Sequence, residues 1–324
     1  MDRLTSMEVF VRTVELGSLA KAADASGLSA GMVGKHLRAL ELRLGTRLLH
    51  RTTRKIALTG VGRTYYERCR RIMADVDEAE RDAIDENALP TGVLRINAPV
   101  VFGSLHLAPA IAAFRALHPQ VEFEVTLNSL YVDLTDGEFD FAIRVGPIGE
   151  VDLVVRQLTV CSQVTCASPA YLEARGEPRT PEDLQRHDCL INLHERQPNE
   201  WRFATAPGQP AVRVAGPIRS NNVTLLCGAA VAGAGILRMP SFVVGEELRT
   251  GKLVPILNTC TERDIGIQSV ALPSRALSVK VRLFIDFLAR HFGPSPPWEQ
   301  WDAQGQCRPG TSGRRSRTAP RPRA

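Results

Sequence analysis

The sequence predicts two unlike parts: a small all-α module with a short two-stranded wing, carried on a long helix, and a larger α/β domain. Three observations support this division. Short capped helical segments with glycine turns fill the first 58 residues, a charged helical pattern follows to about residue 87, and strands then alternate with helices to residue 293. A chain of 324 residues with 44% apolar composition suits one small and one large buried domain.

The segment from residue 18 to residue 58 looks like a helix-turn-helix followed by a basic wing. Ser18 is placed to cap a short helix, whose Ala22 and Ala23 permit close packing of a second helix. Gly27 supplies the permissive backbone of the turn, and Ser29 caps the next helix. This pattern is typical of proteins that bind DNA.

The helix after Ser29 has one apolar face and one open face. The apolar stripe, which we expect to face inward, consists of Val33, Leu37, Leu40 and Leu44. The face that would meet the major groove consists of Ala30, Gly31, Gly34, Lys35 and Arg38. The sequence does not decide whether Lys35 and Arg38 contact bases or phosphates.

Gly31 and Gly34 are unusual, since glycine inside a helix costs about 1 kcal/mol relative to alanine. One interpretation is that they let the helix N-terminus approach the sugar-phosphate backbone closely, where its amides and dipole favour phosphate. The other is tolerated drift on an exposed face.

Basic residues follow in a segment that resembles a β-wing. Arg51, Arg54 and Lys55 are placed to bind phosphates or to enter the adjacent minor groove. The alternative is an ordinary basic loop. Charge is distributed accordingly: residues 1–58 carry ten Lys or Arg against five Asp or Glu, and residues 294–324 carry six against two. Because the whole chain is only +5, the middle is mildly acidic.

A proline-free helix is predicted from Thr59 to about Asn87. Its apolar residues recur at spacings of four and three, which is a heptad-like seam: Tyr65, Cys69, Ile72, Val76, Ala79 and Ala83. We expect this seam to pair with a second copy and to present two recognition helices to DNA. The alternative is that the same stripe packs against the chain's own large domain.

Residues 89–92 predict a hinge, after which βαβ patterns begin. Strands are expected at 93–98, 121–127, 139–145, 160–167, 189–193, 212–215, 235–237 and 269–272, and helices at 105–117, 130–136, 223–232 and 280–292. The alternation predicts a parallel sheet with helices on both faces.

The remaining composition argues for a cytoplasmic protein without metal or cofactor. No run approaches the roughly 18 apolar residues of a membrane span, and the first residues lack the basic and apolar regions of a signal peptide. Seven cysteines without a CxxC pair suggest neither a disulfide framework nor a zinc site. Cys161 or Cys166 could sense redox state, although buried structural cysteines are commoner.

The layout from residue 3 to about 293 resembles the LysR-type transcriptional regulators. The N-terminal resemblance rests on a run of matching positions: Gly17-Ser18, Ala22-Ala23, Val33, Leu37, Leu40-Glu41, Leu44-Gly45, Leu48, Arg51 and Leu58-Thr59. In the body it rests on Leu94-Arg95-Ile96, Ala108-Pro109, Phe139-Asp140, Ala142-Ile143-Arg144, the run 232–236 and Pro240.

The resemblance implies a winged helix-turn-helix domain (1–59), a linker and dimerisation helix (60–91), and an effector-binding α/β domain (92–293) of the periplasmic-binding-protein type 2. Subdomain I is expected at about 92–161 and 268–293, and subdomain II at about 162–267. The implied partners are double-stranded promoter DNA, a small organic effector and further copies of the chain as a homodimer or homotetramer; RNA polymerase is a further candidate.

The sequence departs from the family pattern at three positions in this module. Ser26 stands where the family usually has leucine, which predicts looser helix packing. Gly31 and Gly34 replace residues that are commonly serine, so no hydroxyl at position 34 can contact DNA. His36 is retained as a polar residue of the common kind and is counted with the DNA-binding residues.

Ligands of open α/β sheets bind beyond the carboxyl ends of the strands, which predicts where the effector lies. The candidate contacts are Val101, Phe102, Gly103, Ser104, Asn128, Arg144, Asn221, Asn222 and Arg238. A serine and two arginines favour a small organic anion such as a carboxylate, and a ring from Phe102 or Phe203 could pack against an aromatic one. Each residue also has a structural alternative: Ser104 as a helix cap, Arg144 in a salt bridge, Asn221 at a helix start.

Three other classes of protein are alternatives to a transcriptional regulator. An enzyme would need a catalytic motif, and no phosphate loop, HExxH or GxSxG motif is present. A solute-binding protein would need export and would not carry the N-terminal module. A DNA-compacting architectural protein would ignore both small molecules and DNA sequence. The last 31 residues, 294–324, predict a disordered basic tail that either attracts DNA or is an inert extension.

Overall fold

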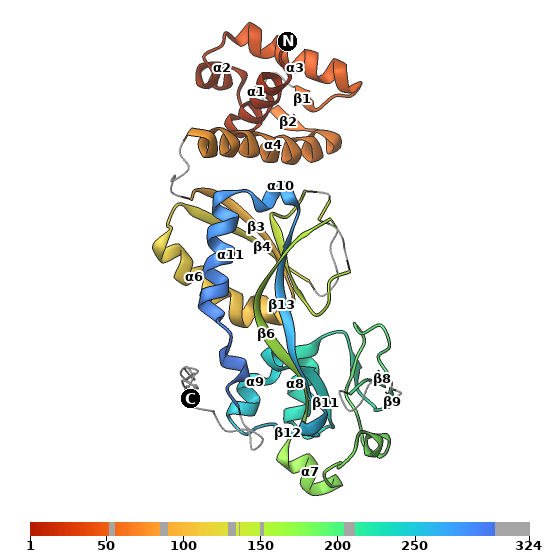
Figure 1. The fold of residues 1–324 in the computed structure, drawn as a ribbon. Coiled ribbons are helices and arrows are strands. Elements are labelled where there is room, and N and C mark those ends of the chain that lie inside the picture. Colours follow the sequence, from red (N-terminus) through yellow and green to blue (C-terminus); the bar gives the residue numbers. More distant parts are fainter. Residues whose placement is uncertain are drawn as a thin grey trace, which may run out of the picture. The chain divides into compact units, whose positions relative to one another are not determined.

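The computed structural model of the protein describes residues 1–51, 56–84, 90–128, 134–135, 137–149, 152–203 and 211–301. Arg54, Lys55, most of the helix expected at 130–136 and the tail beyond Trp301 lie outside these residues, as do the side chains of Arg51, Ala79 and Ala83. The chain forms two compact units, Met1–Gly92 and Val93–Ala324, and each is described by itself (Figure 1).

The first unit contains four helices and a two-stranded sheet among its described residues. They are α1 (Arg3–Leu16), α2 (Leu19–Ser26), α3 (Ala30–Leu44), β1 (Leu49–Arg51), β2 (Ile56–Leu58) and α4 (Gly60–Ile84). The predicted caps are confirmed: the Ser18 hydroxyl accepts from the Lys21 amide at 3.4 Å, and that of Ser29 from Met32 at 3.3 Å. Gly27 ends α2 with a φ of 63°, a backbone conformation that favours glycine.

The core of this unit forms where α1 contacts α2, α3 and α4. Phe10 of α1 is fully buried, and its ring centroid lies 5.7 Å from that of Tyr65 on α4. Cys69, one helical turn further on, is also fully buried in this core. The prediction that Cys69 belongs to an intermolecular seam is therefore wrong, because this core already covers it, and Tyr65 is partly buried in the same core.

Ser26 produces a local defect at the end of α2. Its hydroxyl oxygen is buried and finds no hydrogen-bond partner among the described residues. A buried hydroxyl without a partner is destabilising, because it loses its hydrogen bond to water and gains none in the protein. This agrees with the looser helix pairing expected at this position.

The second unit is built on one seven-stranded sheet with the order β11-β6-β13-β5-β3-β4, and β12 also pairs with β6. Its strands are β3 (Gly92–Ala98), β4 (Val121–Leu127), β5 (Phe141–Val145), β6 (Val154–Ala167), β11 (Leu237–Pro240), β12 (Val254–Ile256) and β13 (Glu262–Ala271). Short strands lie outside it: β7 (Ile191–Asn192) with β10 (Arg219–Ser220), and β8 (Glu200–Trp201) with β9 (Val212–Arg213).

The helices of this unit are α5 (Val100–Phe102), the π-helical turn η1 (Gly103–Leu107), α6 (Ala108–Leu117), α7 (Pro169–Arg175), α8 (Val223–Val231), α9 (Ser241–Arg249), α10 (Pro273–Ala276) and α11 (Val279–Phe292), with 3₁₀ turns η2 (Pro181–Arg186), η3 (Asn258–Cys260) and η4 (Pro297–Glu299). Figure 1 shows α6 and α11 beside the β3–β4 half of the sheet, with α8 and α9 beside β11 and β12.

The sheet is mixed rather than parallel. β3 and β5 are parallel, as predicted, but β13 runs antiparallel to both β5 and β6. β6 and β13 are long strands that run side by side through the unit (Figure 1). Only the second half of β6 and the end of β13 were predicted, because the early part of each strand is largely exposed and carries charged residues.

The helical run Val100–Leu117 is longer than the predicted helix and unusually apolar, with a mean hydropathy of 1.6 over its 18 residues. By length and composition alone it could span a membrane, contrary to the expectation that no run approaches that limit. The core helix of a globular domain passes the same test. One side of this run, with Leu107, Ala110 and Phe114, is buried in the α/β core.

The described residues beyond α11 run to Trp301 and are well packed. Trp298 and Trp301 are buried, and η4 packs against α9. The prediction of a disordered tail from residue 294 is therefore wrong for 294–301, because two indole rings bury enough apolar surface to hold the segment.

Candidate DNA-binding face and effector site

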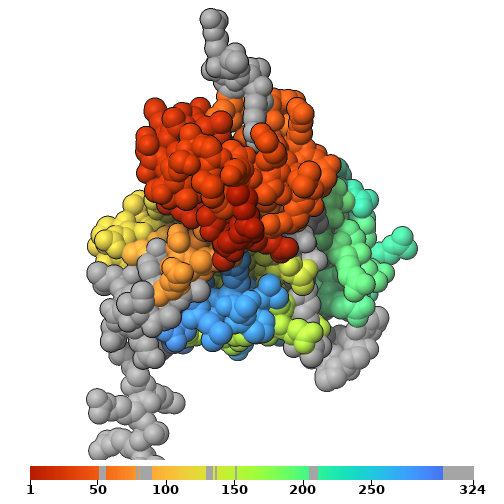
Figure 2. Space-filling model, turned by 90° about the horizontal axis from the view of Figure 1, so that it is seen from above, coloured from red at the N-terminus to blue at the C-terminus, as the bar shows by residue number. Residues whose placement is uncertain are grey.

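Helix α3 presents the open face that its sequence predicts. Val33, Leu37 and Leu40 are buried, whereas Ala30, Gly31, Lys35 and Arg38 are exposed. Leu44, expected in the apolar stripe, is exposed at the last turn. The N-terminus of α3 and two cationic side chains therefore lie on one accessible surface of the unit, whose exterior is shown in red and orange in Figure 2.

His36 does not belong to this face. It is only 6% exposed, and its Nδ1 lies 2.9 Å from the hydroxyl of Ser6 on α1. The prediction that His36 contacts DNA is wrong, because residues 33, 36, 37 and 40 share the inner side of a helix with 3.6 residues per turn. His36 instead joins α3 to α1.

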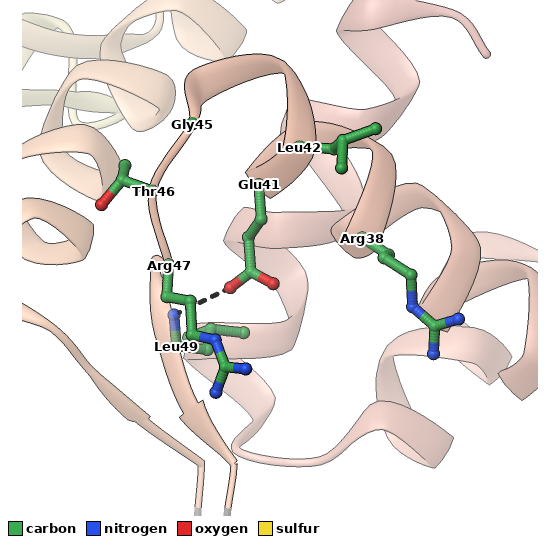
Figure 3. A pocket seen from close by; sticks show the side chains of 7 residues that line it. All are labelled: Arg38, Glu41, Leu42, Gly45, Thr46, Arg47 and Leu49. Carbon is green, nitrogen blue, oxygen red and sulfur yellow. Dashed lines mark hydrogen bonds between the residues drawn. The ribbon is translucent and has the colours of Figure 1, made fainter.

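Glu41 fastens the wing to α3. Its carboxylate accepts hydrogen bonds from the backbone amides of Leu48 at 3.0 Å and Leu49 at 3.2 Å, as Figure 3 shows for Leu49. This contact fixes β1, and with it β2, against the C-terminal half of α3. The register of the wing is Leu49 opposite Leu58 and Arg51 opposite Ile56.

A hollow of about 600 Å³ lies between the end of α3 and the segment that leads into β1 (Figure 3). Arg38 and Arg47 both line it, together with Glu41 and the exposed Leu42. Arg47 was not among the predicted DNA contacts, although it follows the glycine that ends α3. A basic residue directly after a recognition helix is the signal that would have identified it.

The two helical glycines are not required by the fold of the unit. A methyl group added to Gly34 would meet no described atom within 4 Å, and one added to Gly31 would reach only the Ser29 hydroxyl at 3.9 Å. Packing within the chain therefore does not explain them, and the interpretation of close approach to DNA remains alongside drift.

In the second unit, hydrogen bonds connect the carboxyl ends of three strands. The buried Arg144, at the end of β5, donates from Nη1 to Asn97 Oδ1 at 2.8 Å. Asn97 of β3 in turn donates from Nδ2 to Asn128 Oδ1, just after β4, at 3.3 Å. The predicted residues Asn128 and Arg144 are thus brought together, and Arg144 serves as a structural anchor as well as a candidate ligand group.

The predicted contacts at residues 101–104 are not part of this set of hydrogen bonds. Val101 and Ser104 line a hollow of about 470 Å³ with residues of α8 and α9, including Thr224, Cys227 and Glu247. Ser104 lies inside the π-helical turn, so it is not a helix cap. Phe102 and Gly103 are wrong as ligand contacts: the Phe102 ring is fully buried, and a Cβ on Gly103 would approach the Leu127 side chain to 2.2 Å.

Strand β11 of the second unit carries a buried cation. Arg238 is 9% exposed, its Nη2 donates to the Arg202 carbonyl at 2.5 Å, and its Nε finds no partner among the described residues. The guanidinium lies 5.3 Å from the centre of the Phe203 ring. Burial lowers the pKa of Arg238, and the Glu195 carboxylate partly offsets this. Burial of the Glu195 carboxylate raises its own pKa, and Arg238 partly offsets this.

Asn221 and Asn222 differ in role. Asn222 caps α8, and its side-chain oxygen accepts from the Leu225 amide at 3.0 Å. The oxygen of Asn222 is therefore already engaged at the helix N-terminus, whereas Asn221 is exposed beside it. The Nδ2 group of Asn222 is not part of this cap, so Asn221 and Asn222 both stay candidate contacts.

Two family models match the chain. The bacterial regulatory helix-turn-helix protein, lysR family, matches residues 4–63, and the LysR substrate binding domain matches residues 87–293. The chain belongs to the LysR family. It is therefore a DNA-binding transcriptional regulator with an effector-binding domain, and the match decides against the enzyme alternative.

This LysR-type regulator is similar to other regulators along most of its length. It is 34% identical to an uncharacterized HTH-type transcriptional regulator of Haemophilus influenzae, over 87% of this chain and 98% of the relative. It is 30% identical to CrgA of Neisseria meningitidis serogroup B, over 89% and 96%.

Solved structures share the fold of this LysR-type regulator. The structure of CrgA from Neisseria meningitidis aligns with a TM-score of 0.59 at 29% identity, over 89% of this chain and 98% of that one. The full-length structure of the Vibrio cholerae virulence activator AphB aligns with a TM-score of 0.54 at 26% identity, over the same shares.

The cysteines that were considered for redox sensing are buried in this regulator. Burial raises the pKa of Cys161 to about 12 and raises that of Cys166 as well. Oxidation of cysteine proceeds through the thiolate, which burial disfavours here. The structural interpretation of these two thiols is the better supported one.

We predict that Gly34→Ala separates stability from DNA binding. Alanine should stabilise α3 by up to about 1 kcal/mol because the position has room for a methyl group. If the glycine serves close approach, the same change should weaken operator binding. Thermal unfolding and DNA titration of the two proteins measure both effects. A variant that is more stable and binds DNA as tightly as the native protein would support drift instead.

Proposed function

We propose that the regulator binds a two-fold symmetric operator, with the exposed face of one α3 in each half-site and the wing on the adjacent backbone. The arrangement of α3 carries this proposal, since its N-terminus, Lys35 and Arg38 share one accessible surface. Arg47, which lines the same hollow as Arg38, adds a further cation for phosphate. Arg51, Arg54 and Lys55 of the wing extend this basic surface in sequence.

The effector that we infer is a small organic anion, held between the two subdomains. Arg238 supports this inference, because a buried guanidinium with an unpaired Nε–H gains a partner when a carboxylate binds. The Phe203 ring beside it offers an apolar surface for the rest of the molecule. Asn128 and Arg144 supply polar groups from subdomain I, and Asn221 from subdomain II.

A ligand can change DNA binding only if it binds two conformations with different affinity. The effector should therefore favour one angle between the subdomains, and the linker helix α4 would pass this change to the spacing of the α3 pair. Control of a neighbouring gene in the cytoplasm, with RNA polymerase as a further partner, follows from the family and is part of the same proposal.

Self-association has support from exposed apolar surface. One third of the run Val100–Leu117 is buried within the chain, although its composition is that of a core helix. Leu105 on this run is 55% exposed and Leu225 on α8 is 54% exposed. Leu105 also lines one hollow with Thr224 and Val231 of α8. Because exposed apolar surface marks interfaces, we propose that a second copy covers this face. Ile72 and Val76 on α4 remain candidates for a separate contact between linker helices.

We expect a Lys35→Ala, Arg38→Ala variant to lose operator affinity and part of its salt dependence. Each phosphate contact that is lost should lower the slope of log affinity against log salt by about one. Fluorescence anisotropy over a range of salt concentrations measures the slope. Arg282→Ala, Arg290→Ala on α11 removes the same charge from exposed positions of the other unit. Equal losses in both variants would refute a specific role for α3.

The effector site is tested with Arg238→Met, which keeps most of the apolar stem but removes the guanidinium. Native protein should gain thermal stability from one or more members of a panel of small aliphatic and aromatic carboxylates. Arg238→Met should lose that gain, whereas Arg213→Met on the exposed side of β9 should keep it. A carboxylate that stabilises Arg238→Met as well as native protein would exclude Arg238 as its anchor.

The interface is tested with Leu105→Glu, which places a charge in the exposed apolar face. Burying an unpaired carboxylate is costly. We therefore expect the assembly of the variant to dissociate at a higher protein concentration than the assembly of the native protein. Sedimentation or light scattering measures the mass. Leu277→Glu, at another exposed leucine of the same unit, is the control. An unchanged mass for Leu105→Glu would place the interface elsewhere.

A further inference from the structure

The segment Pro294–Trp301, here called the strap, lies beyond the residues that the effector-domain family model matches. It is nevertheless well packed. Trp298 and Trp301 are 3% and 5% exposed, and the Trp301 indole N–H donates to the Trp298 carbonyl at 2.8 Å. The Thr159 hydroxyl holds its start by donating to the Gly293 carbonyl at 2.9 Å.

The strap lies where the long strands β6 and β13 pass from one subdomain to the other. Their pairing is interrupted there: Glu262 lies opposite Gln163 and Ile265 opposite Cys161. Two residues of β13, Arg263 and Asp264, therefore face the single Ser162 of β6, which is a β-bulge. Asp264 has a φ of 58°, in the left-handed region.

Glu299 of the strap supplies a bond where the ladder is interrupted. The Ser162 amide donates to Glu299 Oε1 at 2.7 Å, and the Ser162 hydroxyl to Oε2 at 2.8 Å. The Ser241 hydroxyl, at the start of α9, donates to the same Oε1 in a short hydrogen bond. Charge-assisted bonds of this kind are stronger than neutral ones. The Ser162 amide also donates to the Ser241 hydroxyl at 3.0 Å. One carboxylate thus ties the strap to Ser162 and Ser241, both in subdomain II, while Thr159 holds the start of the strap from subdomain I.

Trp298 joins the strap to both subdomains. Its indole N–H donates to the Val160 carbonyl at 3.0 Å, and its ring lies 4.3 Å from the His106 ring of subdomain I. On the other side it touches α9 of subdomain II, where a Cβ on Gly245 would approach the Trp298 Cβ to 2.9 Å. Glycine at 245 therefore permits the close approach of α9 and strap.

We propose that the strap is an intramolecular latch that holds the two subdomains at the angle seen here. Its bonds are made at one relative placement of β6, α9 and the η1 turn, so any other angle must break or rearrange them. Glu299 is its main positioning residue. The proposal rests on the proposed function in one respect: an effector that favours a different angle has to work against the latch.

The latch is tested by the distance between spin labels in the full chain, without effector or DNA. Labels at Arg115→Cys on α6 and Glu173→Cys on α7 report on subdomains I and II, with Cys307→Ser removing a further thiol. The six cysteines among the described residues are buried. Dilution with unlabelled protein suppresses distances between copies.

Glu299→Gln keeps the packing of the strap but removes the carboxylate charge, so the distance distribution should broaden or shift. Ser241→Ala, which removes one donor, should produce a smaller change of the same kind. Glu246→Gln, an exposed glutamate on α9 that pairs with Arg249, should match native protein. A distribution unchanged by both Glu299→Gln and Ser241→Ala in folded protein would overturn the proposal. Because no effector is used, a failure of Arg238 as an anchor leaves this result unaffected.

Discussion

The packing of α3 against α1 is the contact on which the DNA-binding unit depends. Burial of Val33, Leu37 and Leu40 fixes the rotation of α3 about its own axis, and the bond between His36 and Ser6 adds a polar constraint on the same side. Lys35 and Arg38 are then necessarily outward. Glu41 holds the wing to the same helix, so the exposed face of α3 and the wing strands β1 and β2 are fixed relative to each other.

In the second unit, a continuous sheet positions the side chains that are candidates for effector binding. β6 and β13 belong to one continuous sheet, so the polar groups at the ends of β3 and β5 belong to the same framework as Arg238 on β11. Such a sheet can transmit a change of angle only where its ladder is weakened. The bulge at Arg263 and Asp264 is one such place, and the strap covers it.

Local signals in the sequence predicted much of this fold, and contacts distant in sequence explain most of the errors. Ser18, Ser29 and Gly27 act within three or four residues, so their roles could be predicted. Helical periodicity cannot say which neighbour covers a stripe, and the core of the first unit rather than a second copy covers Cys69. Trp298 and Glu299 gain their partners from residues more than 50 positions away, which no local pattern reveals. Arg238 was predicted by charge alone, and only the structure shows its unpaired Nε.

The central claim is that the exposed face of α3 reads specific DNA sequence as part of a two-fold assembly. Selection of genomic fragments by the purified full chain at near-physiological salt tests it most directly. The account predicts recovery of a few promoter fragments that share a two-fold symmetric sequence, with half-sites about one or more helical turns apart. Indiscriminate recovery across the genome would contradict it, because binding would then rest on phosphate attraction alone.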